Sequence, residues 1–186
     1  MPLTPLDPHT ALVVIDLQQG IVGLAKAHSS DQVVQRSSEL AQAFRQKGLP
    51  VIWVNVTGRA KGKTDAEQPD LSSLPAIWFE LVPELNIQPG DHQLSKQCWG
   101  AFTGTKLHSL LQELKVTQIV LAGISTSAGV ESTARSGYEL GYSVTFASDA
   151  MTERDPAAQI HSIEKIFPRI GQVTDTQSIL NELSKL

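Results

Sequence analysis

Residues 119–134 read IVLAGISTSAGVESTA and carry the strongest structural signal in the chain. The apolar run at 119–122 is too short for a helix of its own and is typical of a buried strand in a parallel sheet. Gly123 ends this run. Three hydroxyl side chains that can cap a helix N-terminus follow it, at Ser125, Thr126 and Ser127. Glu131 then falls in or near the first helical turn, where a carboxylate favours the positive end of the helix dipole. The stretch predicts a strand, a tight polar turn and a helix.

The predicted turn has a consequence for ligand binding. In an open parallel sheet, a turn that leads from a strand into a helix lies at the carboxyl edge, where such folds bind their ligands. Backbone N–H groups at the start of the helix can hold an anion or stabilise a developing oxyanion. We therefore expect a binding site at this turn.

The rest of the chain alternates between apolar runs and segments with helical spacing. Strands are predicted at 11–15, 51–56, 92–96, 119–122, 142–147 and 170–173. Helices are predicted at 31–47, 105–114, from the turn to about Gly141, 157–167 and 176–185, the last capped by Asp175. Such alternation predicts an α/β fold with a mainly parallel sheet. Right-handed crossovers then place helices on both faces of a doubly wound sheet.

The segment from Thr57 to Gly90 is longer than an ordinary connection between two elements. It contains several prolines, and its sequence leaves two interpretations open. It is either a functional loop that covers the site or a series of short helices. Residues 77–81 favour a short helix or a turn within it.

Size and composition limit the class of protein. A chain of 186 residues fits one domain, and 41% hydrophobic residues can form a substantial core. The net charge of −4 argues against a nucleic-acid partner. Cys98 is the single cysteine, so an intrachain disulfide is impossible. The sequence shows no signal peptide and no run long enough for a membrane helix, which makes a soluble cytoplasmic protein the expectation.

Three motifs resemble those of one family. GISTSAGVESTAR at 123–135, VVIDLQ at 13–18 and SKQCWGAFTGT at 95–105 are similar to motifs of the isochorismatase-like hydrolases, also called the cysteine hydrolase family. The resemblance extends from Ala11 to about Phe167. It implies a single domain over residues 1–186 and a six-stranded sheet in the order 3-2-1-4-5-6.

Asp16 and Lys96 are the catalytic candidates. From its sequence context alone, Asp16 could equally be a helix-capping or solvated carboxylate, or an acid or base at the end of a strand. Lys96 alone reads as a solvated lysine. The resemblance implies that Lys96 lies beside Asp16, orients it and stabilises negative charge. Burial would raise the pKa of Asp16 and the lysine would lower it, and the sequence leaves open which effect dominates.

Gly129 occupies the position at which most family members carry a cysteine nucleophile. A glycine cannot form a thioester, so the usual chemistry of the family does not apply. The hydroxyls at Ser125, Thr126 and Ser127 are expected to cap the helix or bind ligand rather than to replace the nucleophile. Cys98 is expected to be structural, although a nearby lysine could activate it. Relatives hold this turn with a non-proline cis peptide, which would be Ile124–Ser125 here.

Metal binding is not expected. Nicotinamidases, which are related, use an Asp-x-His pair and a later histidine after the second strand. Here residues 55–58 read NVTG, and no histidine follows before His92. The remaining histidines lack zinc spacing, and no phosphate-binding loop or dinucleotide motif is present. We therefore expect no cofactor.

Two functions from different classes remain. The first is an isochorismatase-like hydrolase that acts on a small polar metabolite, using Asp16 and Lys96 without a cysteine nucleophile. Substrate or an oxyanion would be bound at the turn and by an aromatic residue, through Ser125, Thr126, Ala128, Gly129, Val130 and Trp99. The alternative is a catalytically silent binding or regulatory protein of the same fold. In either case the resemblance implies a homodimer or a higher homo-oligomer.

Overall fold

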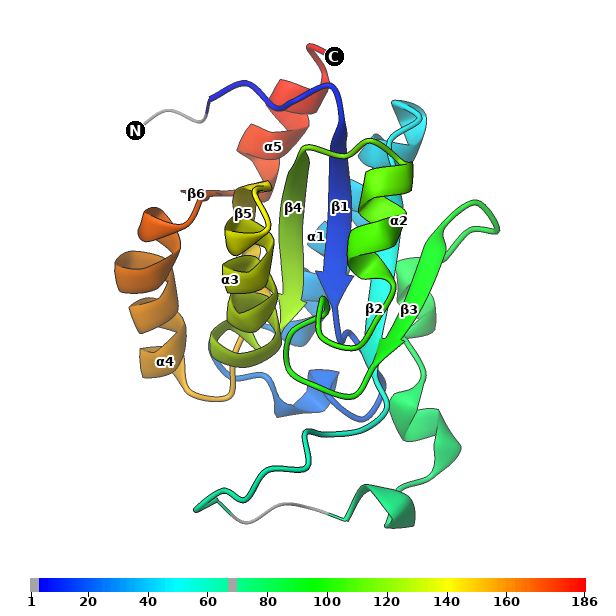
Figure 1. Cartoon of the computed structure of the whole chain (residues 1–186), viewed down its shortest axis with the longest axis vertical. Coiled ribbons are helices and arrows are strands. Elements are labelled where there is room, and N and C mark those ends of the chain that lie inside the picture. Colours follow the sequence, from blue (N-terminus) through cyan, green and yellow to red (C-terminus); the bar gives the residue numbers. More distant parts are fainter. Residues whose placement is uncertain (1–3, 67–69) are drawn as a thin grey trace.

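A six-stranded parallel sheet organises the chain, and a computed structural model describes it over residues 4–66 and 70–186 (Figure 1). The order of the strands is β3-β2-β1-β4-β5-β6, as the family resemblance implied. All five neighbouring pairs are parallel. The strands are β1 (Thr10–Ile15), β2 (Val51–Val56), β3 (His92–Lys96), β4 (Gln118–Ile124), β5 (Ser143–Thr152) and β6 (Gln172–Thr174).

Helices cover both faces of this sheet. On one face, α1 (Ser30–Gln46) and α5 (Thr176–Leu183) pack on one set of strand residues, which includes Leu12, Val14 and Trp53. On the other face, α2 (Leu107–Glu113) and α3 (Glu131–Glu139) pack on the alternate set, which includes Val13 and Ile15 (Figure 1). Because side chains alternate along a strand, one continuous apolar run supplies both cores.

Strand β5 extends further than predicted. The sequence indicated an end at Ala147, because Ser148 and Asp149 are polar, but the strand continues to Thr152 with a shift of register against β4. The hydroxyl of Ser148 donates to the Thr174 carbonyl, and the Asp149 carboxylate accepts the N–H of Thr176. These partners satisfy the polar groups inside the sheet, so the strand does not have to end there.

The predicted helix at 157–167 is divided in the structure. An α-helical part, α4 (Pro156–His161), is followed by a wider turn, η6 (Ser162–Ile166), and a short 3-10 turn, η7 (Phe167–Arg169). Phe167 from the last turn stacks on Phe146 of β5 and is fully buried. The apolar spacing correctly indicated a packed helical segment, but the helical pitch changes along it, so it is not a single α-helix.

The long connection between β2 and β3 contains short 3-10 turns. Three are described, η2 (Leu71–Ser73), η3 (Ala76–Phe79) and η4 (Pro83–Leu85), and a fourth, η1 (Val22–Leu24), follows β1. The short helix or turn expected at 77–81 is confirmed by η3. Residues 67–69, within the predicted irregular segment, lie outside the described part of the chain, as do residues 1–3 of the expected N-terminal lead-in.

Over the residues that the structure describes, the helices are too short or too polar to cross a lipid bilayer.

Candidate active site

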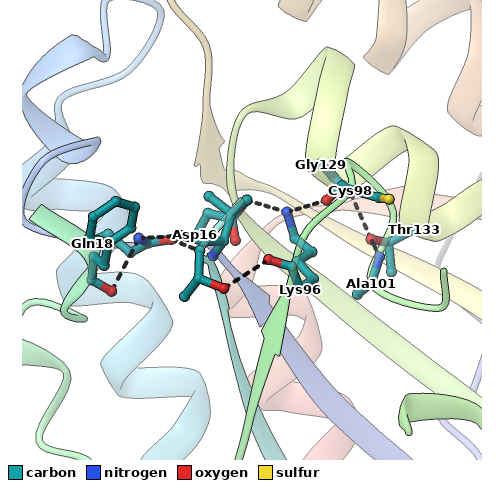
Figure 2. Close-up of polar contacts among 10 residues, drawn as sticks. Asp16, Gln18, Lys96, Cys98, Ala101, Gly129 and Thr133 are labelled. Carbon is teal, nitrogen blue, oxygen red and sulfur yellow. Dashed lines mark hydrogen bonds and ion pairs between the residues drawn. The ribbon is translucent and has the colours of Figure 1, made fainter. Parts of the chain in front are cut away.

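Two charged side chains from separate strands meet at the carboxyl edge of the sheet. Asp16 directly follows β1, and Lys96 is the last residue of β3. The Lys96 Nζ atom lies 2.6 Å from Asp16 Oδ2 and 3.1 Å from the carbonyl oxygen of Cys98 (Figure 2). The expected proximity of Asp16 and Lys96 is therefore confirmed.

The backbone turns sharply at Asp16. Its φ is 54°, in the left-handed region that aspartate adopts more readily than most residues. The Asp16 N–H still donates to the Val54 carbonyl at 2.8 Å, whereas its carbonyl accepts the N–H of Gln18 at 2.8 Å. One peptide thus completes the sheet pairing with β2 and the next begins a tight turn. This geometry carries the carboxylate off the end of the strand.

Burial determines the acidity of Asp16. The residue is 5% exposed, Lys96 is 2% exposed, and Asp16 Oδ1 has no hydrogen-bond partner among the described residues. Desolvation raises the pKa of Asp16 from 3.8 to about 6, although the charge of Lys96 and its hydrogen bond oppose this rise. The question that the sequence left open is answered in favour of burial, and the carboxyl group is poised to exchange a proton near neutral pH.

This raised pKa predicts a pH dependence of stability. Because the folded-state pKa exceeds the unfolded value, protonated Asp16 adds stability that is fully present below pH 3.8 and is lost as the pH rises through about 6. The slope approaches at most about 1.4 kcal/mol per pH unit within that window. Urea unfolding at several pH values should show this loss relative to the double variant Asp16→Asn, Lys96→Met, in which both charges are absent. A difference that stays constant from pH 4 to 6.5 would contradict the assignment.

A cavity of about 230 Å³ opens beside the ion pair. Its wall is formed by the segment after β1, by the long β2–β3 connection and by the turn after β4. The lining residues include Asp16, Ile21, Arg59, Leu71, Trp78, Lys96, Trp99, Ser125, Ala128 and Gly129. A larger hollow of about 630 Å³ beside α1 contains neither Asp16 nor Lys96 in its lining. Because the perturbed carboxyl group marks the chemistry, the smaller cavity is the candidate active site.

Gly129 lies directly against the carboxylate. A Cβ atom at this position would stand 3.3 Å from Asp16 Oδ2 and 2.9 Å from Ile15 Cγ2. The second distance is too short for an unadjusted side chain, so the glycine permits this close approach of the turn to β1. A cysteine side chain at position 129 would therefore begin next to the Asp16 carboxylate.

Residues 10–178 of the chain match the family model of the isochorismatase domain. The chain belongs to the isochorismatase family. It is 42% identical to an uncharacterised isochorismatase family protein, YecD, of Escherichia coli O157:H7, over 94% of this chain and 96% of that protein. It is 30% identical to the ureidoacrylate amidohydrolase RutB of Caulobacter segnis, over 97% of this chain and 90% of that protein. The structure of an isochorismatase family protein from Burkholderia thailandensis superposes with a TM-score of 0.92 at 42% identity, covering 97% and 98% of the two chains.

Most of the binding residues predicted from the isochorismatase motifs line the cavity. Ser125, Ala128, Gly129 and Trp99 do so, and Trp99 is largely exposed, at 66%. The Ile124–Ser125 peptide is cis, as predicted. The roles of these four lining residues in substrate binding stay predictions.

Two of the predicted binding residues do not line the cavity. Thr126 and Val130 are both fully buried. The Thr126 hydroxyl contacts the Thr152 carbonyl and Gln159, each at 3.1 Å, so it links the turn to β5 and α4. Val130 belongs to the apolar core beneath α3. The sequence pattern could not separate these inward positions from their neighbours, because the turn winds as a wide helix, η5 (Thr126–Val130).

The expected hydroxyl cap is also absent from this turn among the described contacts. The N-cap residue, Ser125, makes no side-chain capping bond. The N–H groups of Ala128 and Val130, expected to face a substrate oxyanion, donate to the Ser125 carbonyl at 3.2 and 3.1 Å. A carboxylate distant in sequence, Glu153, accepts the N–H of Ser127 instead. Glu153 was not predicted as part of the site, because a single acidic residue after a strand carries no local signal of such a contact.

Cys98 and potential metal ligands add little to the site. Cys98 is a free, partly exposed cysteine whose backbone carbonyl, rather than its thiol, is bonded to Lys96. No group of three or more potential His, Cys, Asp or Glu ligands is found within residues 4–66 and 70–186.

Trp78 and Arg59 of the long β2–β3 connection complete the cavity wall. The two interpretations of this segment, a loop at the site or a series of short helices, therefore both apply, because it holds short helices and also borders the site.

Proposed function

We propose that this isochorismatase family protein hydrolyses a small polar molecule by acid–base chemistry at Asp16, assisted by Lys96 and without a covalent intermediate. The observation that carries the proposal is the buried carboxyl group of Asp16 in the cavity wall, with a pKa of about 6. At neutral pH such a group is available both as a base and as an acid.

The two ionisation states of Asp16 support the two halves of a hydrolysis. As a carboxylate, Asp16 takes a proton from a water molecule, whose oxygen attacks the substrate. As a carboxylic acid, it returns that proton to the departing group. Lys96 keeps the carboxylate oriented through the 2.6 Å contact and offsets its negative charge. Water is the nucleophile because Gly129 has no side chain.

The substrate class follows from what this chemistry can accomplish. An ether-type bond, such as a vinyl ether, requires only protonation and the addition of water. An amide or ureide is harder to cleave without a covalent nucleophile. RutB, a relative at 30% identity, is named for the hydrolysis of a ureidoacrylate, so ureides belong among the substrates to be tested.

A panel of vinyl ethers, amides and ureides tests this proposal, with product formation followed by liquid chromatography and the variant Asp16→Asn as the control. We expect turnover of at least one compound by the wild-type protein, with ¹⁸O from labelled water in the product. Mass spectra of the acid-quenched protein should show no covalent adduct. A protein that is stabilised by panel compounds but converts none of them would support the alternative, a catalytically silent binding protein. A trapped adduct would contradict the noncovalent mechanism.

A further inference from the structure

Glu153 is a buried acidic residue that the proposed mechanism does not use. It follows β5 and is only 6% exposed. Its Oε2 atom accepts the N–H of Ser127 at 3.0 Å and the hydroxyl of Ser127 at 2.8 Å. Its Oε1 atom accepts the N–H of Arg154 at 2.8 Å. The carboxylate is therefore held by three donors, two of which come from the turn after β4.

The contact with Ser127 lies at the positive end of a helix. Ser127 is in the first turn of η5, and η5 continues without a break into α3. A negative charge is favourable at this end, because the first N–H groups of a helix lack helical partners and the peptide dipoles align. In this protein a side chain of the chain itself supplies that negative charge.

The backbone of Glu153 makes a second connection. Its carbonyl oxygen accepts the N–H groups of Lys26 and Ala27, at 2.9 and 3.0 Å. These residues belong to the segment after β1, which contributes Ile21 to the cavity. The turn after β4 contributes Ser125 to the same lining. One residue thus ties together two of the segments that form the cavity wall.

We infer that Glu153 is a positioning residue whose carboxylate permanently occupies the N–H and hydroxyl of Ser127 at the start of the turn, so that these two donors do not receive an oxyanion from the substrate. Lys96 and Arg59 are the cations among the described residues that line the cavity, and they would meet negative charge on the substrate. This role of the two cations rests on the proposed function, whereas the occupation of the Ser127 donors by Glu153 does not.

Removing the carboxylate provides a test that needs no substrate. In Glu153→Ala the N–H of Ser127 loses its partner, and we expect the melting temperature to fall by roughly 5–10 °C. Sodium formate, a small carboxylate, should enter the vacated site and raise the melting temperature of this variant by several degrees relative to sodium chloride at equal ionic strength. The wild-type protein should not respond, because its own carboxylate fills the site.

Two further variants separate this role from a merely structural one. Glu153→Gln keeps the shape and an acceptor for the Ser127 N–H, so it should fold, be stabilised little by formate, and shift the Ser127 amide proton resonance upfield as the charge-assisted bond weakens. Ser127→Ala removes only the hydroxyl contact and should also be unresponsive to formate. Equal stabilisation of wild type and Glu153→Ala by formate would overturn the inference. If Glu153→Ala does not fold, an unchanged Ser127 resonance in Glu153→Gln would overturn it as well.

These readouts are independent of turnover. Failure of the substrate panel would leave the formate result intact, whereas failure of formate rescue would leave the proposed acid–base chemistry of Asp16 untouched.

Discussion

Replacing Asp16 by asparagine is expected to lower kcat on any substrate of this protein by about 10²–10⁴-fold, the usual contribution of a positioned general acid or base. Asparagine has nearly the same shape as aspartate and can still accept a hydrogen bond from Lys96. It cannot carry the proton that hydrolysis moves from water to the departing group. Because the cavity keeps its shape, the substrate should still bind, so that the loss falls on kcat rather than on KM.

A second ion pair provides the matched control for this experiment. Asp91 contacts Arg45 at 2.6 Å, and its side chain is 3% exposed against 8% for that of Asp16, but Asp91 does not line the cavity that contains Asp16. Asp91→Asn should destabilise the protein while leaving turnover within a few-fold of wild type. Steady-state kinetics on both variants, with thermal unfolding to verify folding, make the comparison. Retention of more than about a tenth of wild-type kcat by Asp16→Asn would remove Asp16 from the catalytic role.

The elements of the sheet were predictable because their signal is local. Apolar runs such as 11–15 and 51–56 must be buried on both faces, and each run fits a central parallel strand. The order of the strands required the family resemblance, since periodicity says nothing about which strands are neighbours. The same resemblance paired Asp16 with Lys96, two residues separated by 80 positions in the chain.

Other features depend on contacts that no local pattern records. The direction of the pKa shift of Asp16 follows from how completely β1, the turn after β4 and Lys96 exclude water, which is a property of the assembled site. Trp78 covers Gly20 so closely that a Cβ atom there would lie 2.0 Å from the indole ring. The partnership of Glu153 with Ser127 likewise joins residues 26 positions apart. In each case the tertiary structure determines the contact partner, whereas the residue type alone is compatible with many different partners.

Substitution of Gly123 by alanine is expected to have the largest effect on folding. Gly123 has a φ of 117°, which side-chain-bearing residues rarely adopt, and a Cβ atom would lie 2.1 Å from the carbonyl oxygen of Ile15 and 2.6 Å from its nitrogen. These are backbone atoms of β1, the central strand to which β4 is paired, so they cannot move aside like the end of a flexible side chain. We expect a loss of about 4–5 kcal/mol or more in the free energy of unfolding, or no soluble protein.

Two other glycines separate the causes of this loss. Gly141 also has a positive φ, 91°, but its added Cβ would meet nothing within 4 Å, so Gly141→Ala should cost only about 1–3 kcal/mol from backbone strain. Gly23 has open space and no positive φ, so Gly23→Ala should change stability by no more than about 1 kcal/mol. Urea unfolding of the three variants gives the comparison. If Gly123→Ala loses no more free energy of unfolding than Gly141→Ala, the backbone of β1 can move aside and the steric explanation is wrong.

Because Ile15 immediately precedes Asp16, any folded Gly123→Ala protein must shift the strand end that carries the Asp16 carboxylate. Its turnover should therefore fall together with its stability.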